Sequence, residues 1–258
     1  MTRLGLCLVL LVAFAGCRSV PEAIPADLSN PRWRALIFGW NAEAKLRKSM
    51  RGTLRLAVDA EGLPSVRSTQ SVAVERPGRL RVEVQGFLNQ TVAVLTSDAE
   101  RYQLFRTDDR SLVGGEVHPG LLWEHAYIGV TPEEAIDLLL GAPILDPTLS
   151  PRAAYDMTEP HGGARLEMAD DRGVTLERGE VDRDGNLIRL DVFDERGLPE
   201  WGVSLRDFQD VSGFAVPHEI DLEVRAGNSR ATLTLSGVEL NPDLPEGLFQ
   251  LREEALVP

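Results

Sequence analysis

The feature that most constrains this chain is a two-residue alternation of apolar and polar side chains that returns along most of its length. Successive side chains of a β-strand point to opposite faces, so this pattern predicts strands with one face buried and the other in water. The clearest examples are residues 54–58, 80–84, 188–192, 220–224 and 231–235. Turns rich in Gly, Asn and Asp separate such runs, as at Asp184-Gly185-Asn186. We expect about ten or eleven antiparallel strands in a sandwich or barrel rather than alternating βαβ units.

Two segments interrupt the alternation with a helical pattern. Residues 33–46 carry apolar side chains at near-helical spacing, with Arg and Lys on the other face. Further on, Thr131, Pro132 and Glu134 have the spacing of a capping box, and Gly141 is placed to end the helix. An apolar helix needs an apolar surface to cover, so we expect residues 119–141 to form a lid over the inner face of the sheet. The lid side chains we expect are Leu121, Leu122, Trp123, Ile136, Leu138 and Leu139.

The amino terminus predicts export. Residues 1–16 combine a basic start, a short apolar stretch and a small-residue exit, which is typical of a signal peptide. The apolar stretch is shorter than the roughly 20 residues that a membrane-spanning helix needs. The sequence Phe14-Ala15-Gly16-Cys17 resembles the bacterial lipobox, in which the cysteine receives a diacylglyceryl group before cleavage. We therefore expect Cys17 to be lipidated, and an ordinary cleavage that leaves a free thiol is the alternative.

The segment that follows predicts how the protein is attached. Residues 17–31 contain three prolines and no apolar period, so we expect a flexible tether that could lift the domain about 40 Å from a bilayer. Residues 32–258 should form a single domain. By resemblance to the sorting rule of Gram-negative lipoproteins, Arg18 after the cysteine indicates the outer membrane, with the domain facing the periplasm.

Composition and motifs argue against several functions. The chain of 258 residues has 27 Lys and Arg against 40 Asp and Glu, a net charge of −13 that disfavours nucleic acid. Ser212 and Ser236 lack the flanking glycine of a nucleophile elbow, and residues 182–186 lack the pattern of a calcium loop. We expect no catalytic residue, metal or cofactor. The four histidines lie far apart and should occupy the surface or loops: His118, His125, His161 and His218.

The apolar inner face of the sheet is then the main functional candidate. Its side chains could fill one another as a packed core, or they could line a cavity for acyl chains. More than about eight strands make a barrel too wide for side chains to fill. The wall positions we expect are Leu54, Leu56, Leu80, Val82, Val84, Val92 and Val94.

Several stretches resemble a known family. Residues 77–87 and 91–98 look like a strand pair of the LolA/LolB-like superfamily, and residues 138–143 and 241–249 are similar too. The superfamily includes periplasmic lipoprotein carriers and outer-membrane lipoprotein receptors. The resemblance implies an unclosed antiparallel barrel around a helical lid, with a cavity for lipoprotein acyl chains. It also implies a membrane-inserting apolar loop in the receptor, for which residues 121–123 are a candidate beside a lid or core role.

The leading hypothesis is therefore a monomeric outer-membrane lipoprotein that binds acyl chains during lipoprotein or lipid transfer. Cys17 makes the chain more similar to the receptor, so a soluble periplasmic carrier is a possible partner. The alternative is a structural or interaction lipoprotein with a filled core. An enzyme is the third hypothesis, and it would need a cleft that groups two carboxylates with a histidine.

Overall fold

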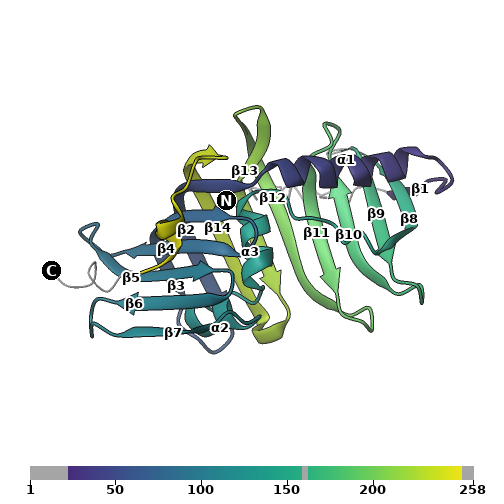
Figure 1. The fold of residues 1–258 in the computed structure, drawn as a ribbon. Helices are drawn as coiled ribbons and strands as arrows, with labels where there is room; N and C mark the ends of the chain where they lie inside the picture. Colours follow the sequence, from purple (N-terminus) through teal and green to yellow (C-terminus); the bar gives the residue numbers. More distant parts are fainter. Residues whose placement is uncertain (1–22, 159–161, 252–258) are drawn as a thin grey trace, which may run out of the picture.

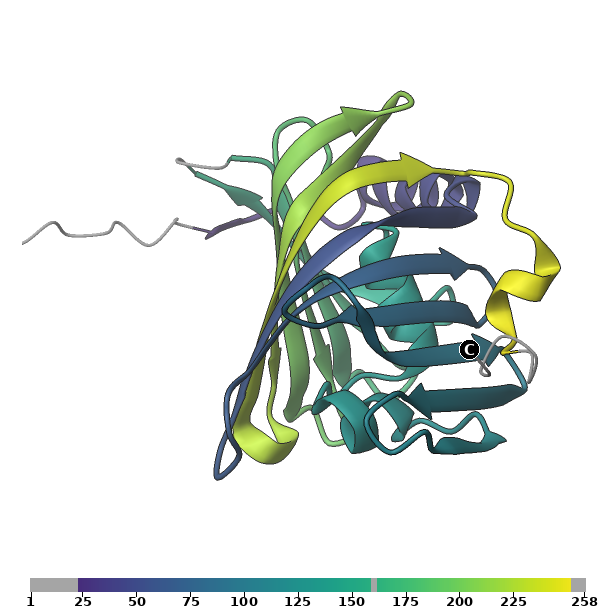
Figure 2. The same cartoon turned by 90° about the vertical axis from the view of Figure 1, so that its left-hand side faces the viewer.

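The computed structural model describes residues 23–158 and 162–251, and these residues form one antiparallel sheet of 14 strands. The sheet curves strongly, and the helices lie on its concave side (Figures 1 and 2). The strands are β1 (Ala23–Pro25), β2 (Ser49–Ala60), β3 (Val66–Glu75), β4 (Arg79–Gln85), β5 (Thr91–Asp98), β6 (Arg101–Arg106), β7 (Leu112–Glu116), β8 (Ser150–Met157), β9 (Ala164–Ala169), β10 (Thr175–Val181), β11 (Leu187–Phe193), β12 (Pro199–Val211), β13 (Phe214–Val224) and β14 (Ser229–Leu240).

The strand order leaves the sheet open. Strands β2 to β7 pair in chain order, as do β8 to β14, and β14 joins the two groups by pairing with β2. This junction aligns Leu233 with Leu56 and Leu235 with Leu54, so the inner face continues across it. Among the described residues, β1 and β7 are the two edges of the sheet and do not pair with each other. The prediction of a mainly β, unclosed antiparallel barrel with a helical lid is confirmed.

The described residues contain more strands than the expected ten or eleven. The edge strands gave no alternating signal. Strand β1 is only three residues long, and β7 includes Gly114-Gly115 and is mostly exposed. Such strands form because a neighbouring strand supplies the hydrogen-bonding partners, and the sequence of the strand itself shows little of this.

The predicted tether is too long. Residues 23–31, which we expected to be flexible, begin the folded domain: Ile24 pairs with Asp156 in β8, and the Ala26 amide donates to the Ala154 carbonyl at 2.8 Å. Pro25 fits here because an edge strand tolerates a residue without an amide proton. Residues 1–22, including the signal segment and Cys17, lie outside the described part of the chain.

Helix α1 (Arg32–Leu46) confirms the predicted amphipathic helix. Its buried face, which includes Trp33, Trp40 and Ala44, covers the inner side of β9 to β11. The indole nitrogen of Trp40 donates to the Pro143 carbonyl at 2.8 Å, which fixes the helix against the loop after α3. Only about 20 Å³ of space remains between this helix and the strands, so this half of the barrel is filled.

Helices α2 (Leu121–Ala126) and α3 (Pro132–Leu139) form the predicted insertion. The Thr131 hydroxyl accepts the Glu134 amide at 3.2 Å, and the Glu134 carboxylate accepts the Thr131 amide at 2.7 Å, which completes the capping box. Gly141 has a φ of 64°, and its amide bonds the Leu138 carbonyl at 2.9 Å. This left-handed residue ends α3 where the sequence predicts. Within the described ranges, no helix is long and apolar enough to cross a membrane.

The C-terminal segment covers part of the outer face. A 3₁₀ turn, η2 (Glu246–Phe249), follows β14 and lies against β4 and β5. Phe249 is buried there beside Ala73 and Leu244. The Leu251 amide donates to the side-chain oxygen of Gln103 in β6 at 2.8 Å. The outer side of these strands is therefore a second, smaller apolar layer. A further 3₁₀ turn, η1 (Ala226–Asn228), connects β13 and β14.

Candidate functional site

The half of the barrel that α1 leaves uncovered contains an apolar cavity of about 290 Å³. Its wall comes from the inner faces of β2 to β6, β13 and β14, and from α2, α3 and the loop between them. The volume lies near the lower end of the range for ligand pockets, about 300 to 1,000 Å³. The concave face thus has a filled half and a hollow half. The sequence alone had left open whether the inner face forms a filled core or a cavity.

Most of the predicted wall residues line this cavity. They are Leu54, Leu56, Leu80, Val82 and Val84. The antiparallel register brings them together, because Val82 lies opposite Val72 on β3 and Leu95 on β5. Alternation in β2 and β4 therefore assigned the inward face correctly.

The prediction was wrong for Val92 and Val94. Neither side chain lies on the cavity wall, and Ala93 and Leu95 line it instead. Val94 pairs with Glu83 and Phe105 on the outer face of the sheet, yet it is only 7% exposed. Strand β5 is apolar on both faces because the C-terminal segment covers the outer side. Because the apolar residues in β5 are continuous, the sequence did not show which of its side chains point inward.

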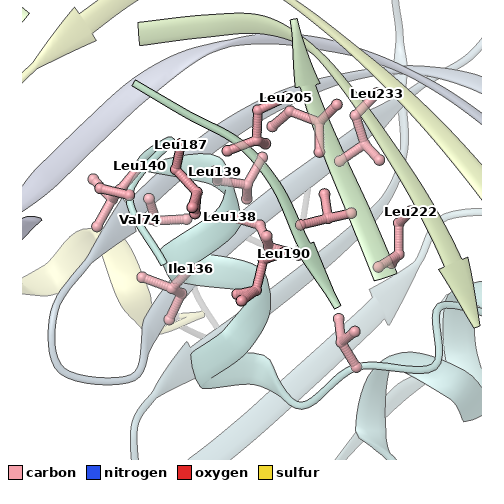
Figure 3. Packing of buried hydrophobic residues seen from close by; sticks show 14 of the residues in the cluster. Val74, Ile136, Leu138, Leu139, Leu140, Leu187, Leu190, Leu205, Leu222 and Leu233 are labelled. Carbon is pink, nitrogen blue, oxygen red and sulfur yellow. The ribbon is translucent and has the colours of Figure 1, made fainter. Parts of the chain in front are cut away.

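The six side chains expected in the lid divide into three that line the cavity and three that do not. Leu122, Leu138 and Leu139 line the cavity, whereas Leu121, Trp123 and Ile136 do not. In Figure 3, Leu138 and Leu139 lie among leucines of β11 and β12: Leu187, Leu190 and Leu205. Ile136 is 1% exposed and belongs to the packed core.

The 121–123 segment is not an exposed apolar loop. Leu121 and Leu122 are buried. Trp123 packs edge-on against Tyr127, with ring centroids 6.1 Å apart, and lies over Gly227 in η1. A Cβ at Gly227 would come within 2.3 Å of the Trp123 ring, so this glycine lets the ring approach the sheet. Trp123 therefore fixes α2 to the β13–β14 connection.

Two arginines, the buried Arg47 and the half-buried Arg76, hold the end of the lid. Arg76, at the end of β3, forms an ion pair with Asp137 of α3 at 2.7 Å and donates to the Ala142 carbonyl at 2.8 Å. Arg47 is 2% exposed and donates to the Gly141 carbonyl at 3.1 Å. Burial raises the pKa of Asp137, and the Arg76 guanidinium opposes that rise. These charge-assisted bonds tie the C-terminus of α3 to the ends of α1 and β3.

A few polar side chains interrupt the apolar wall: Ser68, Gln70, Arg106 and His125. Gln70 donates to the Ser68 hydroxyl at 2.9 Å, so these two satisfy each other. His125 packs against Tyr102, with ring centroids 5.7 Å apart. Arg106 points inward because it follows Leu104 by two residues in β6. Neither Arg106 nor His125 was predicted to line the cavity, although the alternation of side chains in β6 is a signal that could have placed Arg106 there.

The prediction that the histidines occupy the surface or loops was wrong for His218 and His125. His218 is 7% exposed on β13, where its Nδ1 lies 3.0 Å from the Val216 carbonyl oxygen, so it is neither on the surface nor in a loop. His125 lies in α2 on the cavity wall. His161 falls outside the described residues. Within residues 23–158 and 162–251, no group of three or more His, Cys, Asp or Glu is placed to hold a metal ion.

The turn between β4 and β5 exposes the two most accessible large apolar side chains among the described residues. Phe87 is 97% exposed and Leu88 is 79% exposed. The turn itself is ordered by hydrogen bonds, since the Gly86 amide donates to the Gln90 carbonyl and the Leu88 amide to the Gln90 side chain, both at 2.8 Å. Both side chains are therefore presented to solvent by a defined backbone.

No family model matches the sequence, and no curated protein matches it. Solved structures do match. A LolA superfamily protein from Nitrosomonas europaea aligns with a TM-score of 0.57 and 13% identity, covering 84% of this chain and 97% of the other. An outer membrane lipoprotein-sorting protein domain from Vibrio parahaemolyticus aligns with a TM-score of 0.54 and 12% identity, again over 84% and 97%.

The chain has the LolA/LolB-like fold. A DUF1329 family protein from Desulfovibrio piger is also similar, with a TM-score of 0.60 and 9% identity over 86% of this chain and 97% of the other. The LolA/LolB-like fold that the sequence motifs implied is thus confirmed. At these identities the similarity concerns the fold alone.

Proposed function

We propose that this protein is a lipid-anchored protein of the outer membrane that binds acyl chains in its cavity during lipoprotein or lipid transfer. The observation that carries the proposal is the apolar hollow of about 290 Å³ beside a half-barrel that is tightly filled. A filled structural module would need the same packing on both halves. The lipoprotein-sorting protein of similar fold supports the same choice.

The physical basis is burial without a covalent step. Each methylene group that leaves water gains about 0.8 kcal/mol, so ten methylenes gain roughly 8 kcal/mol before the cost of ordering the chain. Transfer from one apolar cavity to another, or to a bilayer, then needs only a small difference in free energy. The lid over the cavity is anchored by Arg47 and Arg76 at one end of α3.

Lipidation of Cys17 would attach the protein to the membrane. Because Ala23 already belongs to the sheet, at most five residues, 18–22, would lie between the sheet and the lipidated cysteine. A five-residue segment spans at most about 18 Å, so the domain would stay close to the bilayer surface. This is a shorter reach than the full tether would give.

Phe87 and Leu88 are the residues we assign to membrane contact. Apolar side chains on an ordered turn gain free energy by entering the interfacial region of a bilayer. Arg55 and Arg67 line the same outer hollow as Phe87, and their positive charge favours a surface with anionic lipids. This turn takes the role that the sequence analysis considered for residues 121–123.

The test is binding of a fluorescent fatty acid to the delipidated protein. Val82→Glu places a carboxylate on the cavity wall, and we expect it to weaken binding at least tenfold, since desolvating an unpaired charge costs more than about 1.4 kcal/mol. Val113→Glu is the matched control, because Val113 is 44% exposed on β7 and does not line the cavity. Equal binding by the wild type and Val82→Glu would contradict the proposal.

A further inference from the structure

We propose that the cavity selects acyl lipids with an anionic headgroup, a carboxylate or a phosphate, which Arg106 binds at the rim with His125 beside it. This inference rests on the proposed function and names the class of ligand for the same site. It separates two kinds of cargo, because the acylated amino terminus of a lipoprotein carries neutral esters and an amide, whereas free fatty acids and phosphate-bearing lipids carry a negative charge.

Arg106 has the position that such recognition requires. It lies opposite Ala93 at the end of β6, on the same inner face as Leu104, and both neighbours line the cavity. Its side chain is exposed, so the aliphatic part can follow the apolar wall while the guanidinium stays at the mouth. A guanidinium offers a planar fork of donors that matches a carboxylate or a phosphate.

The Arg106 guanidinium has no direct partner within the described part of the chain, and its charge acts at longer range, lowering the pKa of Asp109 and of His125. Its side chain makes no hydrogen bond or ion pair there, although acidic residues outnumber basic ones by 40 to 27. On the neighbouring strand β4, by contrast, Arg79 pairs with Glu75 at 3.1 Å and Arg81 pairs with Glu83 at 2.6 Å. The nearby carboxylate of Asp109 is turned to its own loop, where it accepts the Ser111 amide at 2.9 Å.

His125 is the second polar side chain on this wall that is available to a ligand. Its Nε2 is buried and has no hydrogen-bond partner among the described residues. Burial first, and then the positive charge of Arg106, lowers the pKa of His125, while Glu124 opposes the shift and His118 adds to it. The ring is therefore neutral near pH 7 and can make a hydrogen bond to a ligand headgroup without repelling Arg106. A buried polar atom without a partner is costly unless a ligand supplies one.

The remainder of the wall supports one chain with one headgroup. Ser68 and Gln70 bond to each other, so they do not compete for the ligand. Apart from Ser68, Gln70, Arg106 and His125, the side chains that line the cavity are apolar. A cavity of about 290 Å³ also suits a single acyl chain better than the several chains of a lipoprotein anchor.

The experiment compares two ligands that differ only in headgroup charge. The probe is cis-parinaric acid with its methyl ester, bound to the delipidated full chain carrying Cys17→Ser, which removes the protein's own acyl chains from the assay. We expect the wild-type cavity to bind the acid about tenfold more tightly than the ester. Arg106→Gln should lose about tenfold for the acid and keep its affinity for the ester.

Arg101→Gln is the matched control, because Arg101 is exposed at the other end of β6 and does not line the cavity. It should change neither affinity. Equal affinity of the wild type for acid and ester, or an equal loss of both in Arg106→Gln, would overturn the inference and leave the cavity proposal intact. Failure of both probes to bind would overturn the proposed function itself.

Competition distinguishes the headgroups. Palmitate and hexadecyl phosphate present the same length of chain with a carboxylate or a phosphate, and displacement of the probe by either supports the inference and identifies the preferred group. Displacement by neither contradicts it. Displacement by inorganic phosphate alone, at the same concentrations, would show a site for free anions and would also contradict it.

Discussion

At the scale of single residues, Glu177 shows how the filled half of the barrel is joined to the loop after α3. Its carboxylate accepts the Asp146 amide at 3.2 and 3.3 Å. Burial raises the pKa of Glu177 from 4.5 to about 7, with that hydrogen bond opposing the rise. Because the folded pKa exceeds the unfolded one, the associated stability is complete below about pH 4.5 and is lost as the pH rises through about 7.

We expect Glu177→Gln to remove this pH dependence. Relative to the wild type, the variant should gain stability as the pH rises, by at most about 3 kcal/mol, because its amide needs no ionisation and can still accept the Asp146 amide. Urea denaturation at about pH 5 and pH 8 measures the difference. Glu200→Gln, on the exposed start of β12, is the control and should not alter the pH profile. A wild type whose stability rises between these pH values would contradict the assignment.

Residue assignments from the sequence succeeded where one face of a strand is polar. Leu54 and Leu56 alternate with exposed or half-buried neighbours, so their inward direction was readable. Val92 and Val94 failed because β5 is covered on both faces, and the covering segment is more than 140 residues away in the chain. His125 was missed because a single imidazole side chain carries no periodic signal, whereas Arg106 shares the inward phase of Leu104 in β6 and could have been placed from it.

At the scale of elements, α3 depends on long-range polar contacts at its C-terminus. Its start is local, since the capping box involves only Thr131 and Glu134. Its end is held by Arg76, which contacts Asp137, Ala142 and the Arg47 carbonyl, the last at 3.0 Å. The start was therefore predictable from the sequence, whereas the contacts at the end require the folded sheet.

We expect Arg76→Gln to destabilise the protein by about 2 kcal/mol and to speed amide hydrogen exchange in α3, because Asp137 is left buried without its cationic partner. The double variant Arg76→Gln with Asp137→Asn should be less destabilised than the single variant, since it leaves no unpaired charge. Hydrogen exchange and urea denaturation measure both effects. Equal destabilisation of the single and double variants would show that the ion pair is not responsible.

At the scale of the whole molecule, the protein combines an unclosed sheet, a half-filled interior and an apolar turn on its surface. Patterns of alternation and turns predicted the sheet, but its hollow follows from α1 covering only part of the concave face (Figure 1). No local sequence pattern indicates how much of a curved sheet a helix will cover. The cavity was therefore a hypothesis from the sequence, and the structure gives it a position and a volume.

The exposed turn yields a prediction for membrane binding. With Cys17→Ser removing the anchor, Phe87→Ser combined with Leu88→Ser should reduce partitioning to vesicles containing anionic lipid by about tenfold or more, because two large apolar side chains are lost. Vesicle flotation measures it. Leu112→Ser with Val113→Ser is the control, since these side chains are 43% and 44% exposed on β7. The assignment fails if the control pair weakens partitioning as much.

The most direct measurement is a mass spectrum of the lipid extracted from the protein after purification from cell envelopes. We predict that the wild type carries a bound acyl lipid beyond its own anchor, and that Ala93→Phe, which fills the cavity with an apolar ring, carries much less while keeping a β-sheet circular dichroism spectrum. Val113→Phe should carry as much lipid as the wild type. A wild type without bound acyl lipid, or the same amount in Ala93→Phe, would contradict the account.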